Sequence, residues 1–324
     1  MKIKFFIVCF AVAFCSSGHA QIENDSIVYS IKTEYIEKFP NRITARALYT
    51  NTFNSYVFYD RNSDASFTVE PNKQNKIGAS VSYSFITLAY TFAPDFMAEN
   101  RDNADSKLFN LHLRAFFGKW TQSFEIFNQK GFYETVSGIY APDLNNLKIG
   151  GSTSYIFNDR FSYRSISNQD ERQVKSAGSF LAGVNYYYNR FNLFAKDEEE
   201  TIDENFYFID VAFTPGYHYN FVPIRNMLLS AGGNVGIGMN HTWGLDETTT
   251  SLLTLWSVSG TATYDIENLF FGADFNYLSL NHNSDDSTYT RDNISHFQLF
   301  IGYRFKAPKK WVRGMDKIEK KLHL

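Results

Sequence analysis

The segment Asn205–Asn220, NFYFIDVAFTPGYHYN, alternates two kinds of residue with a period of two. One parity carries Tyr207, Ile209, Val211, Phe213, Pro215, Tyr217 and Tyr219, and the other carries Asp210, Ala212, Thr214, Gly216, His218 and Asn220. Successive side chains of a β-strand point to opposite faces, so this strand has a wide apolar face and a small polar face. The polar face has too little volume to form the core of a soluble sandwich. The pattern is typical of a closed barrel in a membrane, with lipid outside and water or polar side chains inside.

The same alternation recurs along the chain between stretches of turn-forming residues. It predicts an all-β, antiparallel up-and-down transmembrane barrel of about 14 strands, with about 12 as the alternative count. The predicted strands are residues 42–59, 76–83, 86–92, 108–117, 120–127, 147–157, 161–165, 177–188, 191–196, 205–220, 226–241, 252–264, 268–282 and 293–305.

Short and long connections between these strands alternate. The short ones include Gly118-Lys119 and Asn189-Arg190, and the long ones include residues 60–75, 128–146 and 166–176. Bacterial barrels place short turns on the periplasmic side and long loops outside. We therefore expect both ends of the barrel sequence, and all the short turns, in the periplasm.

The N-terminus predicts export. Lys2 and Lys4 precede the apolar run 5–15, and small residues lead to a signal-peptidase site near Ala20. Residues 1–20 are therefore predicted to be a signal peptide, and the mature protein is expected in the outer membrane of a Gram-negative bacterium. Residues 21–41 would form a periplasmic lead or small plug, residues 42–305 the barrel, and residues 306–324 a basic periplasmic tail. That tail fits a solvated helix or one that contacts anionic inner-leaflet lipid.

Composition supports this class of protein and excludes several others. The mean hydropathy of −0.31 is ordinary for a soluble protein, yet 18% of residues are aromatic, as the girdles of membrane barrels require. Loss of the signal removes two lysines and no acids, so the formal net charge falls from −3 to −5, which disfavours nucleic acid as a partner. Cys9 and Cys15 both lie in the signal, and the acidic run 197–204 lacks EF-hand spacing. No metal and no cofactor is predicted.

The inward-facing parity carries charged side chains of both signs. They suit either a water-filled passage or a network of ion pairs that fills the barrel, and bulky inward residues such as Phe206, Phe208, Leu278 and Phe300 leave both interpretations open. The predicted lumen-facing charged residues are Arg46, His112, Arg114, Glu125, Lys148, Arg164, Asp210, His218, Asp274 and Arg304.

Two alternatives compete with passive transport or surface interaction by a non-enzymatic barrel. His282 and Ser284 share the His-x-Ser spacing of lipid A deacylases, but the adjacent Asp285-Asp286 is typical of a polar loop tip. A channel for hydrophobic compounds would have a larger N-terminal plug than residues 21–41 provide. The expected partners are outer-membrane lipids, lipopolysaccharide and, because the last strand ends on Phe305, the barrel assembly machinery. A monomer is expected.

Several stretches resemble an uncharacterised family of outer-membrane barrels from Bacteroidota, known as a domain of unknown function. The similar motifs are residues 39–44 (FPNRIT), 131–133 (GFY), 161–164 (FSYR) and 173–179 (QVKSAGS). The resemblance implies a barrel in the outer membrane and a structural role for the last motif. It implies no activity or ligand.

Overall fold

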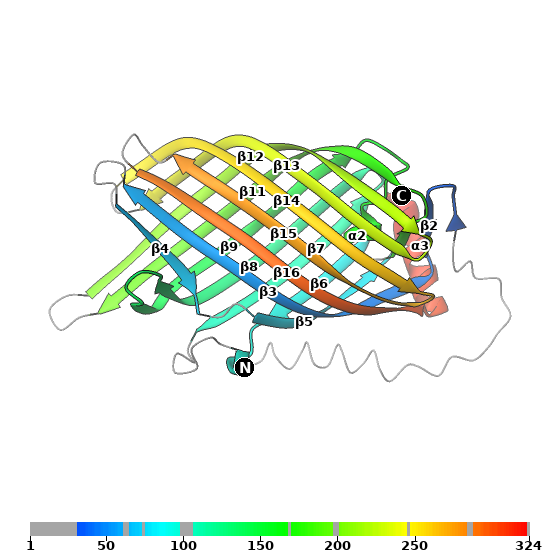
Figure 1. Ribbon diagram of the computed structural model, residues 1–324, viewed down its shortest axis with the longest axis horizontal. Coiled ribbons are helices and arrows are strands. Elements are labelled where there is room, and N and C mark those ends of the chain that lie inside the picture. Colours follow the sequence, from blue (N-terminus) through cyan, green and yellow to red (C-terminus); the bar gives the residue numbers. More distant parts are fainter. Residues whose placement is uncertain are drawn as a thin grey trace.

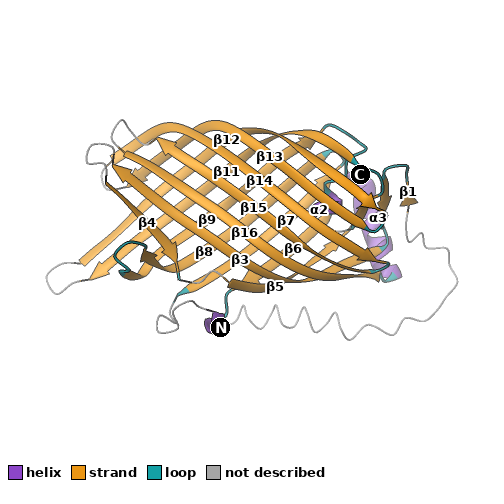
Figure 2. Ribbon diagram, in the orientation of Figure 1, coloured by secondary structure: helices purple, strands orange, loops and turns teal. Residues whose placement is uncertain are grey.

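Twelve antiparallel strands close into one barrel in the computed structural model, which describes residues 31–60, 65–72, 75–97, 106–167, 170–196, 201–244, 247–283 and 288–322 (Figures 1 and 2). The strands are β3 (Arg42–Asp60), β5 (Asn75–Tyr83), β6 (Ile86–Phe92), β7 (Lys107–Phe117), β8 (Trp120–Glu134), β9 (Tyr140–Ile156), β11 (Ala177–Lys196), β12 (Thr201–Ile224), β13 (Met227–Gly244), β14 (Glu247–Ile266), β15 (Leu269–Asn283) and β16 (Thr288–Lys306). The last strand pairs with the first from Thr288↔Asp60 to Lys306↔Arg42, which closes the barrel. The predicted fold class is confirmed, with the lower of the two strand counts.

The alternation that predicted the barrel also sets the faces of its wall. On β12, Val211 and Phe213 are 45% and 53% exposed on the outside, whereas Asp210 and Ala212 are each 1% exposed on the inside. The outward face of the whole wall is rich in exposed Phe, Tyr, Trp, Leu, Ile and Val side chains. The apolar residues therefore face outward and the small polar residues face the lumen.

Two of the predicted strands do not form separate barrel strands. Residues 177–188 and 191–196 belong to the single strand β11, because Asn189 and Arg190 pair with Lys148 and Leu147 of β9 as regular ladder residues. An Asn-Arg pair resembles a turn in sequence, but the side chain of Asn189 is buried in the polar lumen. Residues 161–165 are not a strand; part of this stretch forms the short helix α2 (Arg164–Ser167).

The prediction of an external loop at residues 166–176 is therefore wrong. Strand β9 ends at Ile156 and β11 begins at Ala177, so the described residues of the connection 157–176 lie at the end of the barrel where β3 begins and β16 ends. We call this the terminal end and the opposite one the loop end. The barrel has two strands fewer than predicted. Because this difference is an even number, the predicted strands before residue 157 and after residue 196 keep their predicted directions.

The connection 157–176, called the end segment, folds against the N-terminal lead. Three short strands, β1 (Ile31–Lys32), β2 (Ile36–Lys38) and β10 (Glu171–Gln173), form a small sheet in the order β1-β2-β10. A hydrophobic cluster also holds the end segment on the barrel, because Phe161 and Ile166 pack with Phe116, Ile156 and Leu181. The described part of the predicted lead or plug thus covers the terminal end of the barrel.

Apart from the end segment, the connections at the terminal end are tight turns, and those at the loop end are extended by strands. Ser84, Gly118 and Glu267 all have φ between 53° and 60°, in two-residue connections. At the loop end, β4 (Ala65–Pro71) pairs with β3 and β8, and the 3-10 helix η1 (Asp95–Met97) follows β6. Several loops predicted to be long are shorter, because β8 runs to Glu134 and β13 to Gly244. Predicted loop residues 197–200 lie outside the described residues.

The predicted basic tail forms the helix α3 (Lys309–Leu322), which lies against the outside of the barrel at the terminal end (Figure 1). Val312 and Met315 pack on Ile43 and Tyr83, two outward residues of β3 and β5. Its remaining large apolar side chains, Trp311, Ile318 and Leu322, are exposed. No helix in the described part of the chain combines the length and apolar character needed to cross a membrane.

Candidate functional site: the lumen and its two closing layers

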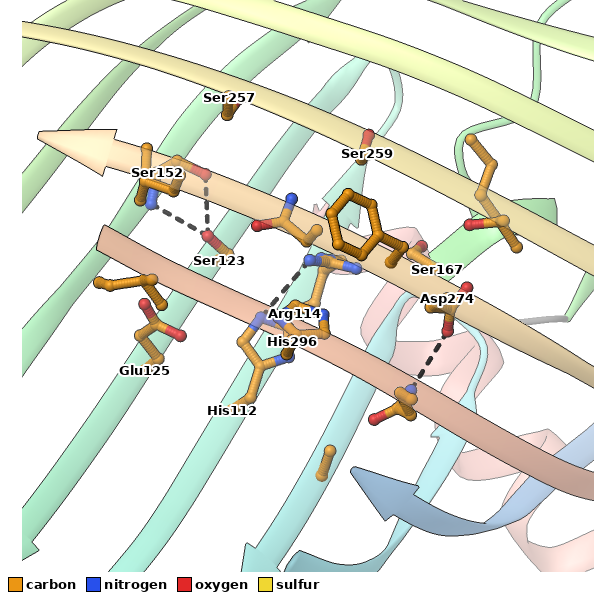
Figure 3. Close-up of a pocket in the computed structure, with 18 of the residues that line it drawn as sticks. His112, Arg114, Ser123, Glu125, Ser152, Ser167, Ser257, Ser259, Asp274 and His296 are labelled. Atoms are coloured by element: carbon orange, nitrogen blue, oxygen red, sulfur yellow. Dashed lines mark hydrogen bonds between the residues drawn. The ribbon is translucent and has the colours of Figure 1, made fainter. Parts of the chain in front are cut away.

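A cavity of about 400 Å³ occupies the middle of the barrel (Figure 3). Inward side chains of nearly every strand line it, and most of these are hydroxyl, amide or charged groups, such as Thr121, Ser123, Asn185 and Ser257. These residues lie in the lumen because each occupies the inward parity of its strand. The cavity is therefore polar and too large to be a packing defect.

Four cations and two carboxylates line this cavity, called the lumen cavity below. The cations are Arg46, Lys76, Arg114 and Lys148, and the carboxylates are Glu125 and Asp274. The Nε of Arg46 donates to Ser80 Oγ at 2.7 Å, and the Nη2 of Arg114 lies 3.5 Å from His112 Nε2. Figure 3 shows Arg114, His112 and His296 close together in the lumen, with Glu125 and Asp274 on either side of the group in this view.

Aromatic rings lie beside each cation of the cavity. The charged groups lie 5.6 Å (Arg46 on Phe300), 5.1 Å (Lys76 on Phe127), 5.7 Å (Arg114 on Tyr163) and 4.5 Å (Lys148 on Tyr187) from the ring centroids. Such contacts offset part of the cost of burying a charge and fix the direction of long side chains. The cavity wall is thereby organised rather than loosely solvated.

The end segment closes the lumen cavity at the terminal end. Tyr163, Ile166 and Ser167 form part of its wall. Behind them, Asn220 of β12 donates to the backbone carbonyl of Ser162 at 2.9 Å and to the Gln173 side chain at 3.0 Å. Because Asn220 and Gln173 are almost completely buried, these bonds tie the end segment to the wall inside the barrel. We call this layer the floor.

Arg164 is the charged centre of the floor. Its guanidinium forms an ion pair with Asp170 and donates to the backbone carbonyl of Ser84, in the turn between β5 and β6. Burial lowers the pKa of Arg164, but the nearby Asp170 and Glu171 carboxylates outweigh it and raise that pKa above its ordinary value. The side chain therefore stays charged and links the end segment to the barrel rim.

Arg304 supports the floor from the last strand. Its Nη1 donates to Asp265 Oδ1 at 2.6 Å, and its guanidinium lies 4.4 Å from the ring centroid of Phe270 and 4.7 Å from that of Phe39. Phe39 belongs to the N-terminal lead. Arg304 thus joins β14, β15, β16 and the lead within one buried contact.

Aromatic side chains fill the lumen on the other side of the cavity, toward the loop end. Tyr56 lies two inward positions beyond the cavity residue Thr52 on β3, and its ring centroid lies 4.8 Å from that of Phe191 and 6.1 Å from that of Phe132. Phe206 and Phe208 pack on this group, which we call the roof. Phe132 is 0% exposed. Gly131 allows the next residue, Phe132, to enter the roof. It lies at a register shift of β8 with a φ of 85°, and a Cβ at this residue would meet Tyr140 Oη at 2.6 Å.

A buried ion group lies beside the roof. His282 Nε2 lies 3.2 Å from Asp210 Oδ1, which also accepts a bond from Asn240 Nδ2 at 2.6 Å. Lys148 Nζ is 3.8 Å from Asp292 Oδ2. Phe208 packs near the His282 imidazole, so the ion group and the roof form one layer.

The structure places the ten predicted lumen residues in three groups. On the cavity wall lie Arg46, His112, Arg114, Glu125, Lys148, His218 and Asp274. Asp210 belongs to the ion group, and Arg304 to the support of the floor. Arg164 was assigned to a strand that does not exist; it reaches the barrel interior from α2 instead.

Sequence reasoning missed several charged or titratable lumen residues, among them Lys76, His296, Asp292 and Asp265, the partner of Arg304. His296 shares its parity with Phe300 and Arg304, two predicted inward residues of the same strand, so a consistent count along that strand would have found it, whereas no inward residue was predicted for the strand that holds Lys76. Asp292 was placed in a loop because β16 extends further than its apolar face indicates. Of the alternative pair, His282 is buried in the ion group and Ser284 lies outside the described residues. No group of three His, Cys, Asp or Glu side chains suited to a metal occurs within the described residues.

Comparison with solved structures gives barrels of distant sequence. OmpT, an outer membrane protein of Vibrio cholerae, is 11% identical with a TM-score of 0.29, over 86% of this chain and 100% of that one. The outer membrane channel DcaP of Acinetobacter baumannii is 8% identical (TM-score 0.25; 86% and 100% covered), and the toluene transporter TodX of P. putida is 9% identical (0.25; 82% and 90%). Similarities this low carry no argument about function.

No curated protein matches the chain. A family model, the domain of unknown function DUF4421, matches residues 23–305. This range includes most of the lead, the end segment and all twelve barrel strands, except for the last residue of β16. The motifs 131–133 and 173–179 fall in the roof and at the floor, where their residues close the lumen. The chain belongs to the DUF4421 family.

Proposed function

We propose that the protein is an outer-membrane barrel whose lumen is a gated passage for small polar solutes. The observation that carries this proposal is the polar lumen cavity, which lies between a floor and a roof inside an apolar outer wall. A barrel that serves only as a scaffold has no need of an organised polar cavity. A constitutively open pore has no need of two buried closing layers.

The apolar outer wall supports the membrane location. Along β16, the outward residues Phe297, Leu299, Ile301, Tyr303 and Phe305 are all between 42% and 54% exposed. Exposing such a row to water is unfavourable by about 25 cal/mol per Å². With the short turns at the terminal end, that end would face the periplasm.

The floor and the roof act in series in this proposal, so a solute crosses the lumen only when both layers are open. The floor is held by polar contacts of Arg164 and Gln173, whereas the roof is held by aromatic packing. The end segment is a connection rather than a barrel strand, and connections open at a lower free-energy cost than paired strands. The floor is therefore the part expected to move first.

Single-channel recording in planar bilayers tests the passage. The wild-type barrel should show brief openings, and Arg164→Ala combined with Phe191→Ala should lengthen them because both layers are weakened. Arg225→Ala, which removes an exposed arginine of the terminal end, is the matched control and should leave the open time unchanged. Correct folding of each variant is checked by circular dichroism. A steady open current from the wild type would contradict the two layers, and the absence of any opening in the wild type would contradict the passage.

We propose no enzymatic activity for this barrel. The imidazole of His282 is 4% exposed and engaged with Asp210 inside the barrel, where a membrane lipid would have to cross the wall to reach it. A lipid A deacylase-like activity would be revealed by hydrolysis of lipid A or phospholipid that stops in Ser284→Ala. Nor does the lining suit a channel for hydrophobic compounds, since charged and hydroxyl groups dominate it.

Partners follow from the same arrangement. The wall is proposed to contact outer-membrane lipids and lipopolysaccharide, and the terminal strand, which ends in Phe305 and Lys306, to engage the barrel assembly machinery. The first and last strands, β3 and β16, pair with each other, so the barrel offers no open strand edge to a second copy. This supports a monomer. α3 carries exposed Trp311 and Ile318 beside six cations and two acids, so it is proposed to contact anionic lipid of the inner leaflet.

A further inference from the structure

Three cations of the lumen cavity lack a carboxylate partner. Arg46, Lys76 and Arg114 form no salt bridge with any of the described residues, whereas Lys148 lies by Asp292. Arg46 and Lys76 are 7% and 3% exposed. A buried cation is costly unless a counter-charge lies close to it. The aromatic rings beside these groups offset part of that cost but supply no negative charge.

The strand register places two of these cations, Arg46 and Arg114, in one region of the wall. Arg46 of β3 lies opposite Ser80, which lies opposite Ala89, which in turn lies opposite His112, so these inward groups follow one row across four strands. Arg114 is the next inward residue of β7 and contacts His112. Glu125 of β8 lies opposite His112 and continues the same row.

The two carboxylates of the cavity form no salt bridge with Arg46, Lys76 or Arg114. Asp274 accepts a hydrogen bond from Gln298 Nε2 at 3.2 Å, and Glu125 lies on the other side of the histidine group in Figure 3. With Lys148 assigned to Asp292, the three remaining cations face two carboxylates, and His112 and His296 add further N–H donors. The cavity wall thus has more positive than negative charge.

We propose that the lumen cavity binds one small anion with oxygen acceptors, of the phosphate or carboxylate class, between Arg46, Arg114 and Lys76. Guanidinium groups suit such ligands because they donate two parallel N–H bonds to two oxygens. A volume of about 400 Å³ accommodates a phosphate ion with some of its water, or a small organic acid. The inference rests on the proposed function and names the class of solute that would pass.

Equilibrium dialysis of the purified full-length protein in detergent against radiolabelled inorganic phosphate tests the site. The dialysis is run on folded protein and on protein refolded from urea with phosphate present, because a closed lumen could exclude the ion. We expect saturable binding of one phosphate per barrel, by at least one route. Acetate as competitor separates the two ligand sources: displacement indicates a general carboxylate and phosphate site, and its failure indicates a phosphate-selective one.

Substitutions of both signs make the test specific. Arg46→Gln and Lys76→Gln should each weaken phosphate binding about tenfold or more, since each removes a charge that faces the ligand in a low-dielectric site. Glu125→Gln should strengthen binding because it removes a repelling charge. Lys119→Gln, which changes an exposed turn at the terminal end, is the matched control and should have no effect.

The outcomes separate this inference from the proposed passage. Absence of saturable binding by both routes, or equal affinity in Arg46→Gln and Lys119→Gln, would overturn the anion site even if the barrel conducts. Phosphate binding by a barrel that never opens in bilayers would support the anion site and overturn the passage. Circular dichroism and heat-dependent gel mobility of each variant exclude misfolding as the cause of lost binding.

Discussion

Placing a charge on the outward face of β12 tests the membrane location directly. Val211 is 45% exposed on that face, and two aromatic groups lie beyond it on either side: Tyr207 stacks on Trp243 at 5.3 Å toward the loop end, and Tyr217 packs on Phe180 at 4.9 Å toward the terminal end. From Tyr207 to Tyr219 the strand advances twelve residues, which at a rise of about 3.3 Å and a tilt of about 45° spans roughly 28 Å along the membrane normal. That is close to the thickness of the hydrocarbon core, and Val211 lies well within it.

The expected magnitude depends on depth and on face. Val211→Arg should lower the free energy of unfolding by about 2–4 kcal/mol, the cost of arginine near the middle of the bilayer. Phe221→Arg changes another outward residue of the same strand beyond Tyr219, and should cost only about 0–1 kcal/mol for the charge. Thr214→Arg directs the same side chain into the polar lumen cavity instead of the lipid, and should be milder than Val211→Arg.

Equilibrium unfolding in urea, with the barrel in phospholipid vesicles, measures these differences. Folded and unfolded populations can be followed by tryptophan fluorescence and by heat-dependent gel mobility. The predicted order of destabilisation is Val211→Arg, then Thr214→Arg and Phe221→Arg. Equal destabilisation by Val211→Arg and Phe221→Arg would refute the depth assigned to β12, and greater damage at Thr214 than at Val211 would refute the assignment of its two faces.

Three further predictions concern the closing layers and α3. Arg304→Met should lower the free energy of unfolding by about 3–5 kcal/mol, because it leaves Asp265 buried beside no cation, and adding Asp265→Asn should recover part of that loss in urea titrations. Phe132→Ala should cost about 3–5 kcal/mol in the same assay, since this ring is fully buried in the roof. Replacing Ile318 and Leu322 with Ser should leave stability in detergent unchanged, but lower it by roughly 1–3 kcal/mol in anionic vesicles, where these side chains would contact lipid.

The face of each strand could be predicted from sequence because the side-chain period of a strand is fixed at two. Val211 and Asp210 need no partner strand to point in opposite directions, and the contrast between a large apolar and a small polar set shows which face is outside. For the same reason, seven of the predicted charged residues lie on the cavity wall. The two missed residues Lys76 and His296 obey the same rule.

The number of strands depended on contacts distant in sequence. Asn189 and Arg190 have the composition of a turn, and only their pairing with β9 and β12 shows that the strand continues through them. Residues 161–165 carry enough aromatics for a strand. They fold instead onto Phe116, Ile156 and Leu181, where Phe161 and Ile166 are buried in one cluster.

The sequence by itself determined a closed barrel with an apolar exterior and a polar, charged lumen, since both properties follow from local alternation along each strand. Only the tertiary structure decided that the lumen is closed at two levels and hollow between them. Arg164 reaches its carbonyl partner at Ser84 across 80 positions of the chain, and Phe132 meets Tyr56 from another strand of the barrel. Such layers arise from side chains that converge across the barrel interior, and no periodicity within a single strand records which of them meet.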